Sequence, residues 1–300
     1  MIIVRLTCGL GNQMFQYAAG RRLAEIHSTL LKLDISRFED IREYRSYALN
    51  CFHIWEHIAT PQEIEIFKQR KSKPMGQRLK SLLYRSKADR KFSEFQFEDS
   101  ILQEQHFHFD PNFFQAPNNV YLDGYWQSEK YFRDIQDIIR REFTVKYPQD
   151  PKSQHIAELI GKTNSVSIHI RRGDYVEHPT IAPKHGFCDL DYYDRAISYI
   201  SDRVSQPHFF IFSDDPHWVK ENLHLKFPII IVDHNGSTRN YEDLRLMSLC
   251  QHQIIANSSF SWWGAWLNSN PEKIVIAPVK WFSGIDYDTS DLVPDNWLRM

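Results

Sequence analysis

The chain has 300 residues, of which 42% are hydrophobic, and its formal net charge is −2. It is long enough to form one large or two moderate domains. Nucleic-acid-binding proteins are usually basic, so this charge argues against a general nucleic-acid binder and predicts that any recognised anion is small. The four cysteines form no Cys-x-x-Cys pair, which predicts reduced thiols in a cytoplasmic protein rather than disulfides or a zinc site. Every apolar run is too short for a signal peptide or a membrane span.

The first forty residues follow a strand–helix–strand pattern. Strands are predicted over 2–6 and 30–35, and a helix with one apolar face over 13–27. A glycine turn, Gly9-Leu-Gly11-Asn12, joins the first strand to this helix. It resembles a dinucleotide-binding loop but lacks the third glycine of that motif, so alone it is weak evidence for a nucleotide site.

A basic segment lies in the irregular, aromatic-rich middle of the chain. Residues 68–91 contain ten Lys or Arg and a single acid, Asp89. Its apolar side chains recur at helical spacing, at Met75, Leu79, Leu82 and Leu83. An apolar stripe bordered by basic residues is typical of a helix that lies on an anionic membrane. The alternative is a solvated helix whose stripe packs on its own domain.

From about residue 164 onward, short apolar strands alternate with helices. The predicted strands are 165–170, 208–213, 228–233, 253–257 and 273–278, and the predicted helices are 189–204, 216–223, 240–250 and 258–268. Such alternation indicates a parallel sheet covered on both faces, and ligands of these sheets bind at the carboxyl ends of the strands. The predicted fold is α/β, with two doubly wound Rossmann-like domains, 1–155 and 156–300, facing a cleft.

The strand at 165–170 runs into two adjacent arginines, in the sequence SIHIRRGDY. His169 and Arg171 are two residues apart, so their side chains are expected on the same face of the strand. Arg171 and Arg172 together offer ten N–H donors in planar forks that suit a phosphate. Asp174 is expected either to orient one of the arginines or to act as a base. The alternative is a plain ion pair between Arg172 and Asp174 in a loop.

A second polar cluster, Ser213-Asp214-Asp215-Pro216, follows the strand at 208–213. An acid directly before a proline is typical of an N-cap followed by the first helical residue, so capping is the favoured role for Asp215. Ser213 and Asp214 remain candidates for a site at the strand end.

A third cluster begins where Asn257 ends a strand and Ser258-Ser259-Phe260 start a helix. Free backbone N–H groups and serine hydroxyls at a helix start form an anion site, although serine is also an ordinary N-cap. The proximity of Arg171 on a neighbouring strand end favours the anion site. Core packing is the favoured role for at least two of the three tryptophans that follow, Trp262, Trp263 and Trp266.

Asp243 lies early in a predicted helix, where the helix dipole favours a carboxylate. A carboxylate also matches the two N–H donors of a guanine edge. Together, the clusters predict a diphosphate site in a two-lobed α/β protein without a Walker loop, a complete Rossmann fingerprint or a metal-binding cluster. A sugar-nucleotide transferase fits this description, because arginines can replace a metal in stabilising a departing diphosphate.

Four segments together resemble the bacterial α-1,2-fucosyltransferases over nearly the whole chain: 9–24, 169–175, 212–215 and 258–268. The resemblance implies a glycosyltransferase of the GT-B type, with an N-terminal acceptor-binding domain and a C-terminal donor-binding domain. It implies transfer of L-fucose from GDP-fucose, with inversion, to the 2-hydroxyl of a galactose. No cofactor and no essential metal are expected. The acceptor is expected to be a galactosyl oligosaccharide or a lipid-linked glycan.

The resemblance also implies roles for individual residues. It implies that Arg171 binds the donor phosphates and that Asp243 binds guanine. Ser258 and Ser259 correspond to the serines at the helix start. The base stays open among Asp174, Glu177 and a group on the N-terminal loop. The remaining predicted donor-binding residues are Gly11, Asn12, His169, Arg172, Ser213, Asp214 and Phe260.

Three alternatives to this function stay open: a fucosyltransferase of another linkage, a metal-dependent GT-A transferase, and a non-catalytic nucleotide-sugar or glycan-binding module. Asp189-Leu-Asp191 would be the metal motif of a GT-A enzyme. However, it directly precedes a helix, where acids are expected in the first turn. The expected location is cytoplasmic, with contact to the inner face of the membrane if 68–91 binds lipid.

Overall fold

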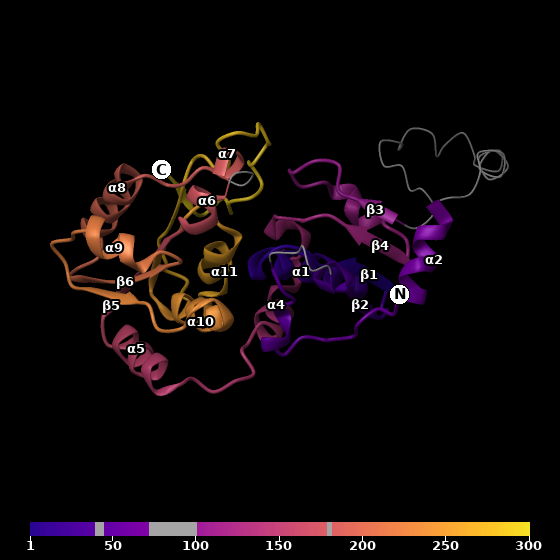
Figure 1. Cartoon of the computed structure of the whole chain (residues 1–300), viewed down its shortest axis with the longest axis horizontal. Helices are drawn as coiled ribbons and strands as arrows, with labels where there is room; N and C mark the ends of the chain where they lie inside the picture. Colours follow the sequence, from indigo (N-terminus) through magenta and orange to yellow (C-terminus); the bar gives the residue numbers. More distant parts are fainter. Residues whose placement is uncertain (40–44, 72–100, 179–181) are drawn as a thin grey trace. The chain divides into compact units, whose positions relative to one another are not determined.

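The computed structural model describes residues 1–39, 45–71, 101–178 and 182–300. The chain divides into two compact units, drawn in Figure 1. Unit 1 contains 1–50 and 54–142, and unit 2 contains 51–53 and 143–300. The predicted boundary after 155 falls inside helix α5, Pro151–Gly161, which belongs to unit 2. The connecting residues join unit 2 because Phe143 packs on Trp263, with ring centroids 5.1 Å apart.

Unit 1 is built on a four-stranded parallel sheet in the order β2-β1-β4-β3. The strands are β1 (Ile2–Arg5), β2 (Leu31–Asp34), β3 (Ile101–Gln103) and β4 (Val120–Asp123). Helix α1, Leu10–Ile26, connects β1 to β2, so the predicted βαβ unit is confirmed. Gly20 lets α1 approach the sheet closely, since a Cβ there would lie 3.0 Å from Leu31 and 3.2 Å from Val4.

Helix α1 begins earlier than the sequence pattern indicated, at Leu10 instead of residue 13. The Gly9 carbonyl accepts hydrogen bonds from the backbone N–H groups of Asn12 and Gln13, at 3.0 and 3.1 Å. These bonds close the first turn, so Gly11 and Asn12 lie in the helix and not in a loop before it.

The rest of the described part of unit 1 is helical or irregular. Its helices are η1 (Ser36–Glu39), α2 (Pro61–Lys71), η4 (Pro111–Gln115), η5 (Glu129–Tyr131), η6 (Arg133–Ile135) and α4 (Gln136–Glu142), and η2 (Leu49–Cys51) spans the junction of the units. Of the basic segment 68–91, residues 68–71 end α2, and the remainder lies outside the described residues. Within the described chain, no helix combines the length and hydrophobicity needed to cross a bilayer.

Unit 2 is built on a six-stranded parallel sheet in the order β10-β9-β8-β5-β6-β7. The strands are β5 (Asn164–Ile170), β6 (Pro207–Ser213), β7 (Ile229–Val232), β8 (His252–Ile254), β9 (Val275–Ala277) and β10 (Leu298–Arg299). Each of the five strands predicted for this half of the chain overlaps an observed strand, but β8 ends at Ile254 and not at residue 257. The sequence did not indicate β10, because two residues are too short to show a period.

Helices cover both faces of this sheet. They are α5, α6 (Gly173–Glu177), α7 (Ala182–His185), α8 (Leu190–Ser201), α9 (Pro216–Asn222), η7 (Ser237–Arg239), α10 (Asn240–Leu249) and α11 (Ser259–Leu267). Alternate residues of β5, such as Val166 and Ile168, pack in one core with α8 and α9. The intervening residues face the other side, where His169 meets Phe260 of α11 at 5.6 Å between ring centroids.

The tryptophans of α11 belong to the core, as predicted. Trp262 and Trp263 are fully buried and Trp266 is 3% exposed. The indole N–H of Trp262 donates to the Leu292 carbonyl at 2.8 Å, so this buried polar group is satisfied. All four cysteines are free thiols.

Candidate active site at the carboxyl edge of the second sheet

Arg171 directly follows β5 and is held between two carboxylates. Its Nη1 lies 2.8 Å from Oδ2 of Asp214, and its Nη2 forms a second ion pair with Asp174. The guanidinium also lies over the ring of Tyr175, 5.2 Å from its centroid. Burial alone would lower the pKa of Arg171, but the two carboxylates outweigh burial and raise it. The ion pair considered between Arg172 and Asp174 was therefore assigned to the wrong arginine.

Arg172 has a different environment from Arg171. Its guanidinium stacks on Trp218 of α9, 3.9 Å from the ring centroid, and its Nε is 3.8 Å from Oδ2 of Asp215. Its backbone N–H donates to Oδ1 of Asp214 at 2.9 Å. The two neighbouring arginines thus contact different elements, and Arg172 is directed toward α9.

Asp214 connects these groups, because it accepts from both arginines at the end of β6. It requires a glycine opposite: a Cβ on Gly173 would lie 2.5 Å from Oδ2 of Asp214. The next residue, Asp215, caps α9 by accepting from the backbone N–H of Trp218 at 3.0 Å, as predicted. The hydroxyl of Ser213 accepts from the Asp215 N–H at 3.0 Å, so Ser213 shapes the same turn.

His169 is a buried neutral imidazole next to the arginine motif. It is 5% exposed, and its Nδ1 has no hydrogen-bond partner among the described residues. Burial, assisted by the charge of Arg171, lowers the pKa of His169 to about 3. At neutral pH the ring is therefore uncharged, with one N–H donor and one acceptor.

The start of α11 lies at the same edge and is linked to the arginine motif through Tyr175. The Tyr175 hydroxyl donates to the backbone carbonyl of Asn257 at 3.4 Å. The Asn257 side chain is buried and donates to the carbonyls of His185 and Trp281, both at 3.1 Å. This anchors the turn that presents the helix start.

Ser258 is the N-cap of α11, and Ser259 and Phe260 are its first helical residues. The Ser258 hydroxyl accepts from the Phe260 N–H at 3.3 Å, so it is partly used in capping. The N–H groups of a helix start and its dipole favour an anion. The structure therefore brings these three residues, the arginine motif and His169 to one edge of one sheet.

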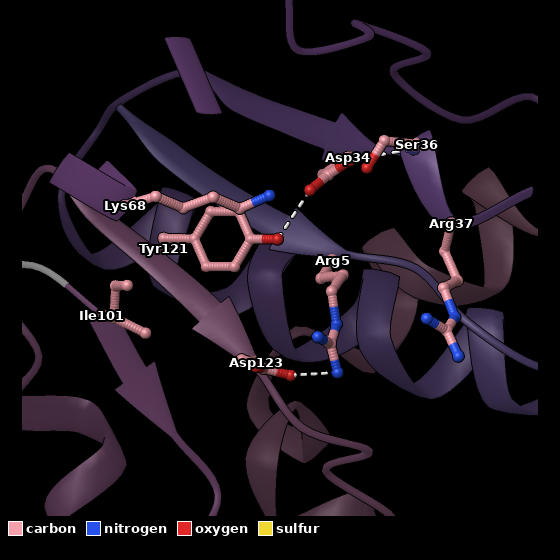
Figure 2. A pocket seen from close by; sticks show the side chains of 8 residues that line it. All are labelled: Arg5, Asp34, Ser36, Arg37, Lys68, Ile101, Tyr121 and Asp123. Carbon is pink, nitrogen blue, oxygen red and sulfur yellow. Dashed lines mark hydrogen bonds and ion pairs between the residues drawn. The ribbon is translucent and has the colours of Figure 1, made fainter. Parts of the chain in front are cut away.

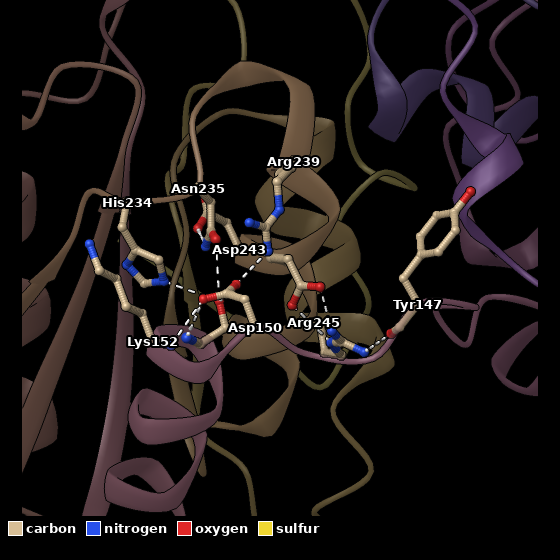
Figure 3. Close-up of polar contacts among 10 residues, drawn as sticks. Tyr147, Asp150, Lys152, His234, Asn235, Arg239, Asp243 and Arg245 are labelled. Carbon is tan, nitrogen blue, oxygen red and sulfur yellow. Dashed lines mark hydrogen bonds and ion pairs between the residues drawn. The ribbon is translucent and has the colours of Figure 1, made fainter.

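Asp243 lies in the first turn of α10 and is held by a polar network that the sequence did not reveal (Figure 3). The amide nitrogen of Asn235 donates to Oδ1 of Asp243 at 2.7 Å. The Ser153 hydroxyl lies 3.2 Å from the Asn235 amide oxygen and 2.9 Å from Asp150, which also pairs with Arg239. Together these bonds connect α5, the loop after β7, and α10.

Burial raises the pKa of Asp243 to about 7, the bond from Asn235 opposes that rise, and the neighbouring Glu242 adds to it. Asn235 is itself 5% exposed. The available sequence signal for Asn235 was the Asn-Gly dipeptide after β7, where Gly236 has φ of +66°. That pattern predicts a turn and gives no indication of a contact with Asp243.

The remaining predicted residues lie elsewhere or are not described. Gly11 and Asn12 belong to unit 1, and Oδ1 of Asn12 accepts from the Gln127 amide at 2.8 Å. Glu177 ends α6, but its side chain lies outside the described part of the chain.

The Asp189-Leu-Asp191 sequence forms a helix start. Asp189 caps α8 by accepting from the Tyr192 N–H at 2.9 Å, and Asp191 lies in the first turn. Among the described residues, no group of three or more His, Cys, Asp or Glu side chains is placed to hold a metal ion. The capping role expected for this sequence is therefore confirmed.

The chain contains two parallel α/β units, and one of them carries candidate anion-binding groups at the carboxyl edge of its sheet. The crystal structure of the NodZ α-1,6-fucosyltransferase soaked with GDP-fucose has the same fold, with a TM-score of 0.50 and 16% identity. The match covers 90% of this chain and 96% of that chain. The predicted GT-B fold is confirmed.

The family profile of glycosyl transferase family 11 matches residues 1–298, and the chain belongs to that family. It is 33% identical to an α-1,2-colitosyltransferase of Escherichia coli over 100% of this chain and 99% of the relative. It is 32% identical to the E. coli O-antigen biosynthesis glycosyltransferase WbnK, over 98% of this chain and 99% of that relative. Human galactoside α-(1,2)-fucosyltransferase 1 is 27% identical over 49% of this chain and 42% of its own length.

Proposed function

We propose that this enzyme transfers L-fucose from GDP-fucose to the 2-hydroxyl of a galactose in an acceptor glycan, with inversion at the anomeric carbon. The 1,2 linkage appears in the names of both the bacterial and the human relative, which are a colitosyltransferase and a fucosyltransferase. The observation that carries the proposal is the placement of Arg171, His169 and the start of α11 at one sheet edge. A colitose donor is the second candidate, because of the 33% identical relative.

Arg171 is the proposed ligand of the donor diphosphate. Its guanidinium has five N–H donors, and the ion pairs with Asp174 and Asp214 engage two of its nitrogens, Nη2 and Nη1. The remaining donors are fixed in direction by these pairs before a substrate arrives. Negative charge on the leaving diphosphate grows in the transition state, and one preorganised donor at such a charge contributes about 3 kcal/mol.

His169 and α11 supply further donors that carry no titratable charge at neutral pH. A neutral imidazole, with its pKa lowered to about 3, can donate a hydrogen bond without depending on protonation. The N–H groups at the start of α11, after Ser258, favour a phosphate oxygen through their direction and the helix dipole. These groups would share the charge of the departing GDP with Arg171, and we propose that no metal is required.

Asp243 is the proposed selector of guanine. An ionised carboxylate accepts from both N1–H and the 2-amino group of guanine, and adenine lacks this donor pair. Asn235 already donates to Oδ1 of Asp243, which fixes the rotation of the carboxylate in the first turn of α10.

We assign Asp174 to positioning Arg171 and not to proton transfer. Its carboxylate is paired with Arg171, and its side chain is 8% exposed, which leaves little room for an acceptor hydroxyl. The general base therefore remains to be identified between Glu177 and a group on the N-terminal loop. In the reaction, the acceptor hydroxyl loses its proton to this base as it attacks the anomeric carbon, and the C–O bond to GDP breaks.

The proposal is tested by incubating the purified chain with lactose and one donor at a time: GDP-fucose, GDP-colitose, GDP-mannose or UDP-galactose. Release of nucleoside diphosphate should be fastest with GDP-fucose and should depend on lactose. Faster release with GDP-colitose would show that colitose and not fucose is the transferred sugar, while the proposed transfer reaction would stand. Binding of a donor without release from any of the four would instead indicate a non-catalytic binding module.

A further inference from the structure

A cavity of about 400 Å³ opens in unit 1 on one face of its sheet, at the carboxyl ends of the strands (Figure 2). It is lined by Arg5, Asp34, Ser36, Arg37, Lys68, Ile101, Tyr121 and Asp123. Apart from Lys68, the first residue of the basic segment 68–91, none of these residues was singled out in the sequence. Parallel α/β sheets bind ligands at this edge, so the position itself suits a binding site.

Among the described residues, α2 packs on only part of this sheet face. Ile64 and Phe67 of α2 pack against Ile3 and Tyr121 in the amino-terminal half of that face. Arg5 lies two residues after Ile3 in β1, so its side chain is on the same face of the sheet. Arg5 is paired in register with Asp34, and the carboxyl-terminal half of this face therefore presents charged side chains. These polar residues form the floor of the cavity beyond the apolar contact with α2.

The floor is preorganised by hydrogen bonds. Asp34 is fully buried, with Oδ2 accepting from the Tyr121 hydroxyl at 2.6 Å and Oδ1 from the Ser36 N–H at 2.9 Å. Burial, together with the carboxylate of Asp34, raises the pKa of Tyr121 far above its ordinary value, so the phenol remains a donor. The bond to Ser36 turns the chain after β2 and places Ser36 and Arg37 at the rim.

The lining is richer in cations than in free acceptors. Three basic side chains face two carboxylates, and both oxygens of Asp34 are already engaged. Asp123 pairs with Arg5 at 2.5 Å, yet the Arg5 side chain is still 42% exposed. Figure 2 shows Lys68 extending from α2 toward the Tyr121–Asp34 pair. Among the described lining residues, the basic side chains exceed the carboxylates by one, in a chain whose net charge is −2.

A ligand for this site must offer negative charge and hydrogen-bond acceptors. Guanidinium groups match carboxylates and phosphates through paired N–H donors. The volume of about 400 Å³ lies toward the small end of the roughly 300–1,000 Å³ typical of small-molecule sites, which suits one sugar ring with a substituent. Ile101 and the ring of Tyr121 provide apolar contact beside the charged groups.

We infer that this cavity binds an acidic monosaccharide unit of the acceptor glycan, one that carries a carboxylate or a phosphate. That this glycan is the acceptor rests on the proposed function. The preference for an acidic sugar rests on the cavity alone. The enzyme would then prefer a charged glycan, with the acidic unit held in unit 1.

The test is calorimetric or NMR titration of the full chain at low salt with matched pairs of sugars. Methyl β-glucuronide is compared with methyl β-glucoside, and glucose 6-phosphate with glucose, while inorganic phosphate reports the anion alone. Each charged sugar should bind at least about tenfold more tightly than its neutral partner and more tightly than inorganic phosphate. The glucuronide and phosphate arms distinguish the two kinds of acidic group.

Lys68→Glu reverses an exposed charge on α2 and should reduce the affinity for the preferred acidic sugar by about tenfold or more. The matched control is Lys162→Glu in unit 2, whose side chain is 73% exposed, and it should change nothing. Equal affinity for charged and neutral sugars would overturn the inference. So would equal affinities of the two variants, or inorganic phosphate binding as tightly as the sugar phosphate. These titrations need no donor, so a failure of fucose transfer would leave their result standing, and the converse also holds.

Discussion

Replacing Asn235 with alanine should shift the pH dependence of GDP binding to higher pH. Asn235 donates at 2.7 Å to Asp243, whose pKa burial has raised to about 7. A raised acid pKa means that the carboxylate becomes protonated as the pH falls below about 7. Because guanine recognition requires the ionised form, GDP affinity of the unaltered enzyme should fall below that pH and level off above it. Loss of the Asn235 donor moves this transition to higher pH.

The size of the effect follows from the strength of one charged hydrogen bond, roughly 1.5–3 kcal/mol. A change of one in pKa corresponds to about 1.4 kcal/mol, so the pKa of Asp243 should rise by roughly 1–2. With a rise to roughly 8.5, the ionised fraction at pH 7 drops from about one half to about 3%. GDP affinity would then be about fifteenfold weaker at pH 7 but only about twofold weaker at pH 8.5.

The measurement is a calorimetric titration with GDP between pH 6 and pH 8.5. Asp243→Asn should bind weakly with little pH dependence, and Asn222→Ala, at an exposed asparagine on α9, should match the unaltered enzyme. The other titratable side chains in or beside this network include Asp150, Lys152, His234, Arg239, Glu242 and Arg245. All of them are retained in the three variants, each of which differs from the unaltered enzyme at one position only.

Two results would refute this reasoning. If the unaltered enzyme bound GDP equally well at pH 6 and pH 8.5, ionisation of Asp243 would have no part in binding. If Asn235→Ala weakened binding by the same factor at every pH, the asparagine would act only through the fold of the loop after β7 and not through the carboxylate.

Further predictions concern turnover, metal and membrane. Arg171→Lys keeps the charge but loses the planar fork, and kcat should fall at least about a hundredfold, whereas near-normal kinetics would remove Arg171 from the site. Gly173→Ala should displace Asp214 and lower kcat, while Gly161→Ala, where a Cβ meets nothing within 4 Å, should not; equal rates in the two variants would contradict the role of Asp214. Transfer in EDTA should stay close to that with magnesium or manganese, and a loss reversed by manganese would show a metal requirement. Co-sedimentation with anionic liposomes should fade with salt and when basic residues in 68–91 are reversed in charge; equal, low binding throughout would leave that segment a solvated surface.

The features that the sequence predicted well are local ones. The apolar strand patterns at 165–170 and 208–213 predicted β5 and β6. The Asp215-Pro216 pair correctly predicted the start of α9. The core position of Trp262 follows from the apolar helix that contains it. Each depends on residues within a few positions along the chain, so periodicity and capping chemistry are sufficient to predict them.

Contacts between distant segments were not predictable in the same way. Which arginine pairs with Asp174 depends on where β6 places Asp214, and the Asn235–Asp243 bond depends on the loop between β7 and α10. The cavity in unit 1 brings together Arg5, Asp34 and Lys68, which are far apart in the sequence, and no local pattern around any of them predicts it. These are consequences of packing, and a single sequence shows only the residue types that packing brings together.

The central claim is tested most directly by the structure of the product formed from GDP-fucose and lactose. Two-dimensional NMR of the purified trisaccharide gives the linkage from the carbon shifts of galactose and the anomeric configuration from the fucose H1–H2 coupling. Our account predicts a single product with an α-fucosyl group on the galactose 2-hydroxyl, so that the β-configured donor has been inverted. Fucose on another hydroxyl, a β-fucoside, or unchanged lactose with intact donor would contradict it.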